Sequence, residues 1–154
     1  TVELAGSFAS KLTKQSKDID ILIKSKKFKS KEEVENTTLM KEIVKELTAT
    51  EIVTDILSLG KTKLLGIARL NSKLPHRHLD MRLVGEDGYI FAKMYYTSGA
   101  MFNKMMRTAA KKNKLKLNEW GLYDLKGNRV DGLKDEKDIF KKIGMDFVIL
   151  EERR

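Results

Sequence analysis

The sequence contains no cysteine, so disulfide bridges and thiolate metal sites are both excluded. It has no apolar stretch long enough to cross a bilayer and no charged-then-apolar leader at its start. These absences favour an intracellular protein without a membrane partner, nuclear if the source is a cellular eukaryote; a viral origin stays open. The chain begins Thr-Val-Glu without a methionine, and we therefore expect it to be a piece of a larger protein.

Only one proline occurs among the 154 residues and 41% of them are hydrophobic, which fits a folded chain and not a fibrous or disordered one. This length allows one domain or two small subdomains. Lysine and arginine exceed the acidic residues, and the formal net charge is +9. Such an excess points to an anionic partner, with nucleic acid as the leading candidate.

The first half of the chain predicts five strands and one helix. Strands are expected at residues 2–8, 17–23, 52–57, 64–70 and 78–84. Residues 9–17 between the first two are expected to form a polar loop. Ser30 stands three residues before Glu33, a capping-box pattern that opens a helix. The apolar stripe of that helix comprises Leu39, Met40, Ile43, Val44 and Leu47.

The character of the chain changes after Gly85. The pattern predicts helices at 88–96, 100–113 and 135–143, strands at 115–117 and 122–125, and a hairpin turn at 126–128. Methionines such as Met94, Met101, Met105 and Met106 are expected in the core. The predicted fold class is α+β: a mixed sheet with flanking helices in residues 1–85, followed by a small mixed α/β subdomain in residues 86–154.

Two aspartates two residues apart are the sharpest chemical feature. On a strand Asp18 and Asp20 point to the same side, so their carboxylates stand roughly 7 Å apart. This spacing can hold two divalent ions about 4 Å apart, as in-line phosphoryl transfer requires. Magnesium fits such a site because it takes hard oxygen ligands. The alternative is that both aspartates are ordinary surface residues that keep an exposed strand face soluble.

A third carboxylate, Asp80, lies on another alternating strand. If Leu79, Met81 and Leu83 face the core, then His78, Asp80 and Arg82 share the opposite side. Asp80 can then join Asp18 and Asp20, and Arg82 can hold one carboxylate in position. Three neighbouring carboxylates repel one another unless cations neutralise them, so a metal is expected. His76 and His78 suggest a zinc site instead, but neither a cysteine nor a third nearby histidine supports it.

A basic segment follows in the second half. Residues 100–117 contain six lysines and arginines and no acid. Asn103, Arg107 and Lys114 fall near one face at helical spacing, which could follow a phosphate backbone or a groove. A solvated lysine face without a partner is the alternative.

Five segments occur in the order AGSFAS…KDIDILI, TDILSLGKTKLLG, PHRHLDMRL, YYTSGAMFNKMMR and KLNEWGLYDLKG. Together they resemble the family X DNA polymerases, the DNA polymerase beta-like group, over essentially the whole chain. The resemblance implies a catalytic palm in residues 1–85 and a nucleotide-selecting thumb (also called fingers) in residues 86–154. The family's N-terminal lyase and helix-hairpin-helix regions have no counterpart here. The implied protein is a monomeric DNA-directed DNA polymerase that acts on gapped or primer-template DNA in base excision repair.

By position, the resemblance makes Asp18, Asp20 and Asp80 the catalytic residues and the ligands of two Mg²⁺ ions, for which Mn²⁺ can substitute. Asp80 would also accept the proton of the primer 3′-hydroxyl. The residues expected to bind the dNTP are Gly6, Ser7, Lys17, Tyr95, Tyr96, Ser98, Gly99 and Asn103.

The resemblance also implies contacts to DNA and a set of residues that change partners on closing. The DNA contacts are expected at Lys63, His78, Lys104, Arg107, Asn118 and Trp120. The closing network comprises Arg82, Asn118, Glu119 and Trp120.

Several positions depart from the family pattern. Ala9 and Ser10 replace two arginines, Lys17 replaces a glycine, and His78 replaces an arginine. The Thr-Gly-Ser turn of the family reads Thr97-Ser98-Gly99. These changes bear on the triphosphate and primer contacts. They keep two alternatives open: a template-independent nucleotidyltransferase, and a non-catalytic DNA-binding scaffold that retains the fold.

Overall fold

The computed structural model describes residues 2–6 and 17–154. These residues form two compact units, one from residues 2–5 and 17–86 and one from Gly6 and residues 87–154. The predicted first strand and polar loop extend into residues 7–16, and Ser7, Ala9 and Ser10 therefore lie outside the described residues. No helix in the described ranges has the length and apolar character needed to cross a membrane.

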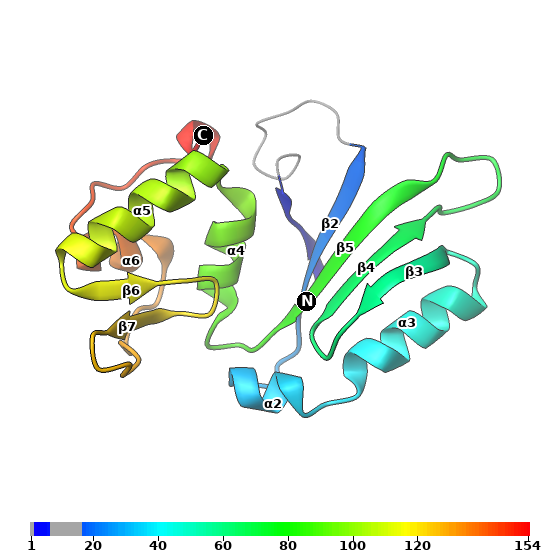
Figure 1. Cartoon of the computed structure of the whole chain (residues 1–154), viewed down its shortest axis with the longest axis horizontal. Helices are drawn as coiled ribbons and strands as arrows, with labels where there is room; N and C mark the ends of the chain where they lie inside the picture. Colours follow the sequence, from blue (N-terminus) through cyan, green and yellow to red (C-terminus); the bar gives the residue numbers. More distant parts are fainter. Residues whose placement is uncertain (1, 7–16) are drawn as a thin grey trace. The chain divides into compact units, whose positions relative to one another are not determined.

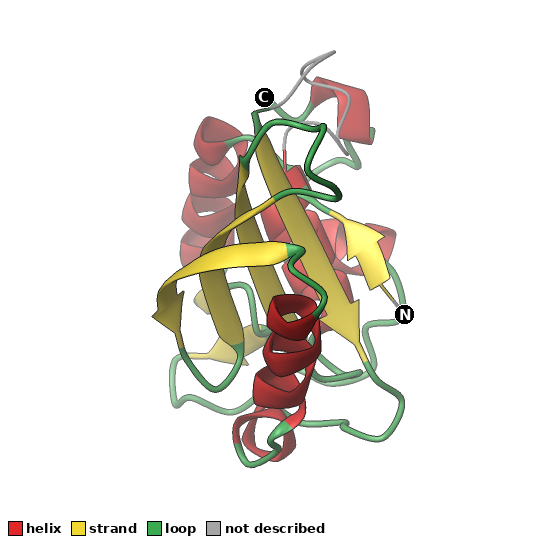
Figure 2. Ribbon diagram, turned by 90° about the vertical axis from the view of Figure 1, so that its right-hand side faces the viewer, coloured by secondary structure: helices red, strands yellow, loops and turns green. Residues whose placement is uncertain are grey.

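The first unit is a five-stranded mixed sheet with helices on one face (Figure 1). The strand order is β1-β2-β5-β4-β3, and only β2 and β5 run parallel. Figure 2 shows these strands as one continuous, twisted sheet. The elements are β1 (Val2–Leu4), β2 (Asp18–Lys24), α2 (Lys31–Glu35), α3 (Leu39–Ala49), β3 (Val53–Leu59), β4 (Lys63–Ala68) and β5 (Arg77–Val84). The predicted strands are thus confirmed, with shifts of a few residues at their ends.

One face of the sheet packs on the helices because alternate side chains point to the same side. Ile23, Leu79, Met81 and Leu83 from β2 and β5 belong to the core cluster, as the alternation predicted. Val34 of α2 and Met40 and Val44 of α3 complete it from the other side. The opposite face carries Asp18 and Asp20 of β2 and Asp80 and Arg82 of β5, together with the buried Leu22 and Val84.

The prediction of a single helix after Ser30 was wrong, because the structure has two helices there. The Ser30 side chain accepts the Glu33 N–H and caps α2, as expected. The helix ends at Glu35, with Asn36 as its C-cap, and α3 begins at Leu39. The Thr37 hydroxyl accepts the Leu39 N–H, 3.2 Å away. Short polar side chains that bond to nearby backbone compete with a continuous helix, which explains the break.

The strand β3 forms one edge of the sheet and pairs irregularly with β4. Its register shifts between Val53 and Asp55 and again between Ile56 and Ser58. Only Val53 of this strand is buried, whereas Leu57 is 62% exposed. The edge strand therefore presents apolar side chains along a kinked backbone.

From residue 87 onward, the second unit combines three α-helices with a two-stranded sheet. Its elements are α4 (Tyr89–Thr97), α5 (Ala100–Lys112), β6 (Leu115–Leu117), β7 (Leu122–Asp124), α6 (Glu136–Lys142) and the 3-10 helix η1 (Leu150–Glu152). The core packs Phe91 and Met94 of α4 and Phe102 of α5 against Ile139 and Phe140 of α6. Asp135 accepts the Asp138 N–H and caps α6. The predicted elements are confirmed here, and the chain is an α+β protein.

Three details of this unit differ from the sequence predictions. Met94 and Met106 are buried, but Met101 and Met105 are 67% and 55% exposed, so they are not core residues. Lys114 lies beyond the end of α5 with a φ of 58°, so it does not continue the helix face. Residues 126–128 do turn the chain, but the returning segment makes only an isolated bridge between Tyr123 and Arg129.

Candidate active site

The carboxylates lie on two adjacent parallel strands. In the register of β2 and β5, Asp20 stands opposite Asp80 and Asp18 stands opposite His78. Period-two alternation places these side chains on the face of the sheet away from the helices. Long-range pairing thus brings together side chains that are sixty residues apart in the sequence.

A cleft of about 390 Å³ opens at this place in the first unit. Its polar lining comes from both strands, and its apolar lining includes Leu57 of β3 and Leu65 and Gly66 of β4. A Cβ atom on Gly66 would lie 2.7 Å from the Asp55 carbonyl oxygen, so β3 approaches β4 closely only because this residue is glycine. All three candidate aspartates, Asp18, Asp20 and Asp80, line this cleft.

Arg82 holds Asp80 in position, as the sequence predicted. Its Nε lies 3.3 Å from Oδ1 of Asp80, and its Nη2 donates a 3.4 Å hydrogen bond to Oδ2. Oδ1 is buried, and among the described residues no group donates a hydrogen bond to it. A buried carboxylate oxygen with unused acceptor capacity is suited to bind a cation or a proton.

Asp20 sits in an unfavourable environment for a negative charge. Partial burial raises the pKa of its carboxyl above the ordinary value, and the nearby Asp80 and Asp18 raise this pKa further. Arg82 acts in the opposite direction and lowers the pKa of Asp20. Arg82 thus offsets only part of the unfavourable environment of Asp20, since the pKa of that carboxyl stays raised.

The side chains are nevertheless not arranged as a finished metal site. Within the described ranges, no three His, Cys, Asp or Glu side chains are placed so that they could hold a metal ion together. Arg82 already engages Asp80 in an ion pair. The zinc pair suggested for His76 and His78 finds no support in this set either.

The other residues predicted in the first unit occupy varied places. Lys63 pairs in register with Arg82, so it lies on the carboxylate face of the sheet. Lys17 is exposed just before β2 begins. Gly6, predicted in the catalytic palm, is grouped with the second unit instead, and its φ of 74° lies in the left-handed region that favours glycine.

In the second unit the aromatic pair and the basic helix come together. The rings of Tyr95 and Tyr96 meet edge to face with centroids 5.0 Å apart. The guanidinium of Arg107 lies 5.4 Å from the centre of the Tyr95 ring, a cation–π contact. The Asn103 amide donates a 2.8 Å hydrogen bond to the Tyr95 carbonyl, so it fastens α5 to the end of α4. Lys104 is exposed on the same helix.

The turn between α4 and α5 is closed by the last residues of the chain. The Gly99 N–H donates a 2.7 Å hydrogen bond to the Arg153 carbonyl. A Cβ on Gly99 would lie 2.7 Å from the carbonyl carbon of Arg154, so a larger residue would displace this segment. Ser98 Oγ is buried and has no hydrogen-bond partner among the described residues.

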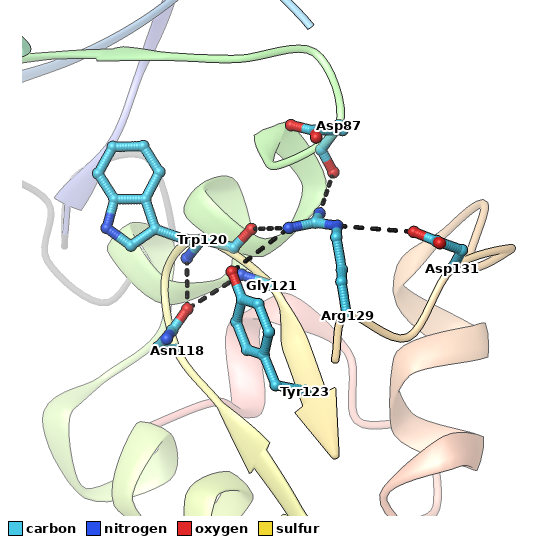
Figure 3. A network of polar contacts seen from close by, with 7 residues as sticks. All are labelled: Asp87, Asn118, Trp120, Gly121, Tyr123, Arg129 and Asp131. Atoms are coloured by element: carbon cyan, nitrogen blue, oxygen red, sulfur yellow. Dashed lines mark hydrogen bonds and ion pairs between the residues drawn. The ribbon is translucent and has the colours of Figure 1, made fainter. Parts of the chain in front are cut away.

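The predicted network residues Asn118 and Trp120 form a turn between β6 and β7 (Figure 3). Oδ1 of Asn118 accepts the N–H groups of Trp120 and Gly121 at 2.8 and 3.0 Å. Glu119 lies half-buried between them. The Trp120 carbonyl accepts a 2.8 Å hydrogen bond from Arg129, a residue that the sequence interpretation missed. No local pattern distinguishes such an arginine from one on a solvated loop.

Comparison with protein families agrees with this arrangement. Residues 1–86 match the family described as DNA polymerase beta palm, and residues 92–154 match DNA polymerase beta thumb. The two matches define the class: a palm-and-thumb region of the DNA polymerase beta type. The chain belongs to the DNA polymerase beta family, the family X DNA polymerases.

A curated relative gives the same result. DNA polymerase lambda of Rattus norvegicus is 32% identical over 96 residues, which cover 55% of this chain. The chain spans only 17% of the length of that polymerase. The shared part therefore concerns the palm and thumb region and not the whole relative.

Proposed function

We propose that this chain carries the catalytic centre of a DNA-directed DNA polymerase that fills gaps during DNA repair. A primer 3′-hydroxyl attacks the α-phosphate of a dNTP, a new phosphodiester bond forms, and the bond to the leaving pyrophosphate breaks. The pairing of Asp20 with Asp80 on parallel strands, inside a cleft that Asp18 also lines, is the observation that supports this proposal most directly.

The donor types in the cleft suit a hard divalent cation, although no three such side chains among the described residues are placed to hold one together. Asp18, Asp20 and Asp80 offer carboxylate oxygens, and one buried oxygen of Asp80 accepts no hydrogen bond among the described residues. Asp18, Asp20 and Asp80 would hold the metal ions, with Mg²⁺ as the expected metal and Mn²⁺ as a substitute. Such ions, when bound, stabilise charge on the attacking and leaving oxygens.

The residues of the chain have distinct tasks in this proposal. Asp80 accepts the proton of the primer hydroxyl, and Arg82 keeps that carboxylate oriented through its paired contacts. In the second unit Tyr95 and Tyr96 flank the sugar of the dNTP. Lys104 and Arg107 supply positive charge to the template strand.

Single-nucleotide extension of a gapped duplex tests the proposal. The chain is incubated with each dNTP in turn, with Mg²⁺ or with a chelator. We expect incorporation that depends on Mg²⁺ and on the templating base. Asp80→Asn should reduce the rate roughly 10²–10⁴-fold, because the general base is lost. Glu46→Gln, which neutralises an exposed carboxylate on α3, is the matched control and should leave the rate unchanged.

The outcomes separate the competing functions. Incorporation that ignores the templating base would instead identify a template-independent nucleotidyltransferase. DNA binding without any metal-dependent dNTP binding or incorporation would identify a scaffold. An Asp80→Asn protein as active as its parent would refute the catalytic assignment itself.

A further inference from the structure

Arg129 joins two segments of the second unit that are far apart in the sequence (Figure 3). Its Nη1 donates a 2.8 Å hydrogen bond to the Trp120 carbonyl, and its Nη2 donates a 2.8 Å hydrogen bond to the Asp87 carbonyl. Its Nε lies 3.8 Å from the Asp131 carboxylate. One guanidinium thus connects the β6–β7 turn with the residues just before α4.

Aromatic rings and glycines surround this guanidinium. Its central carbon lies 5.5 Å from the Phe91 ring centre and 5.9 Å from the Tyr123 ring centre. A Cβ on Gly121 would lie only 2.5 Å from Nη1, so a larger residue at this position would displace the guanidinium of Arg129. Gly88 has a related constraint, since its Cβ would lie 3.1 Å from the Trp120 carbonyl oxygen.

Arg129 contacts the turn through the backbone carbonyl of Trp120. Figure 3 shows the Trp120 indole pointing away from the guanidinium. The Asn118 side chain closes the turn from within through the N–H groups of Trp120 and Gly121. Arg129 therefore determines where the turn as a whole lies relative to the beginning of α4.

We infer that Arg129 is a positioning residue for DNA binding, which rests on the proposed function. It holds residues 118–121 so that Asn118 and Trp120 meet the DNA in the correct place, and it does not touch the DNA itself. Its side chain is only 25% exposed, and each of its three nitrogen atoms already faces a partner within the unit.

Two variants disturb this contact in different ways. Arg129→Lys keeps the charge but cannot donate to both carbonyls at once. Gly121→Ala keeps the arginine and pushes its Nη1 away from the Trp120 carbonyl. We expect each variant to bind gapped DNA about tenfold more weakly, the effect of losing one or two hydrogen bonds from a charged donor. The rate at saturating DNA should stay within about twofold, because the carboxylates are untouched.

Lys126→Gln serves as the control, since it removes one exposed positive charge from the neighbouring loop. The slope of log affinity against log salt concentration reports how many phosphates the protein neutralises. If Arg129 contacted a phosphate, Arg129→Met would reduce this slope by about one, whereas a positioning role leaves the slope unchanged. The loss of affinity should also disappear when Trp120→Ala is the parent protein. A lower melting temperature with unchanged DNA affinity would show a purely structural role and overturn the inference.

Amide hydrogen exchange keeps the inference separate from the proposed function. In Arg129→Lys the N–H groups of Trp120 and Gly121 should exchange faster, whether or not DNA is present. Unchanged exchange at both positions would refute the positioning role. A parent protein that has no affinity for gapped DNA would instead contradict the proposed function, and with it the DNA-binding part of the inference.

Discussion

Asp20 and Asp80 stand directly opposite each other on parallel strands, so each carboxylate lies in the electric field of the other. Burial and the two neighbouring aspartates raise the pKa of Asp20 in the folded protein. A raised pKa means that folding favours the protonated form, so ionisation of Asp20 destabilises the native state at neutral pH. The ionised Asp20 therefore destabilises the folded site until a bound cation neutralises its charge.

The first prediction concerns stability. Asp20→Asn should raise the melting temperature at pH 7 without divalent ions, because it removes a charge that the fold disfavours. The gain should shrink as the pH falls below the raised pKa and vanish below the ordinary value of 3.8, where the parent is protonated in both states. Added Mg²⁺ should also reduce the difference by stabilising the parent. Calorimetry with Glu46→Gln as control tests this, and a lower melting temperature for Asp20→Asn would contradict it.

The second prediction concerns Arg82. Its charge lowers the pKa of Asp20, so Arg82→Gln should move the acidic limb of the pH–rate profile to higher pH. Loss of its contacts to Asp80 should also slow the reaction about 10–100-fold, as is usual for residues that orient metal ligands. Arg82→Lys should restore the pH limb more completely than the rate, because lysine keeps the charge without the paired geometry. If the acidic limb of the pH–rate profile stays at the same pH in Arg82→Gln, then Arg82 does not influence the pKa of Asp20 in this way.

The third prediction concerns the ion pair between the buried Arg153 and the half-buried Glu136. Nη2 of Arg153 lies 2.6 Å from Oε2 of Glu136, and the Arg153 side chain is 1% exposed. Arg153→Ala should cost roughly 3–5 kcal/mol in the free energy of unfolding, since it leaves a carboxylate and core space uncompensated. Chemical denaturation measures this change, with the exposed Arg154→Ala as control. A loss below about 1 kcal/mol would show that the pair does not hold the end of the chain.

The fourth prediction concerns the turn after β7. Hydrogen bonds from Asn128, first its backbone N–H, lower the pKa of Asp124, whose Oδ1 also accepts the Lys126 N–H. A lowered pKa stabilises the fold above the ordinary pKa, and this contribution disappears as the pH falls through the lowered value. Asp124→Ala should therefore speed amide exchange at Lys126 and Asn128 at neutral pH. Asp124→Asn keeps an acceptor and should lose the pH dependence alone, and Asp146→Ala is the control.

Alternation along single strands predicted much of the first unit. Alternation puts Leu79, Met81 and Leu83 on one face of their strand and Asp80 on the other. This holds for any partner strand. The register that sets Asp20 against Asp80 depends on parallel pairing between distant segments, which no local pattern contains. The resemblance to a family supplied that part.

Other features could not be read from local patterns for physical reasons. Met101 and Met105 occur next to Phe102 and Met106, and both pairs have the spacing of one helix turn. Only the tertiary packing decides that the second pair faces the core and the first is exposed. The tasks of Arg129 and Arg153 were hidden for the same reason, since their partners are backbone carbonyls and a distant glutamate.

The irregular pairing of β3 has a consequence beyond the cleft wall. An edge strand with exposed Ile56, Leu57 and Leu59 is a template onto which a foreign strand could add. The two register shifts interrupt the row of backbone groups that such an intermolecular pairing needs. Substitutions that straighten β3 would therefore favour self-association before they harm catalysis, so solubility is the property to watch when this wall is redesigned.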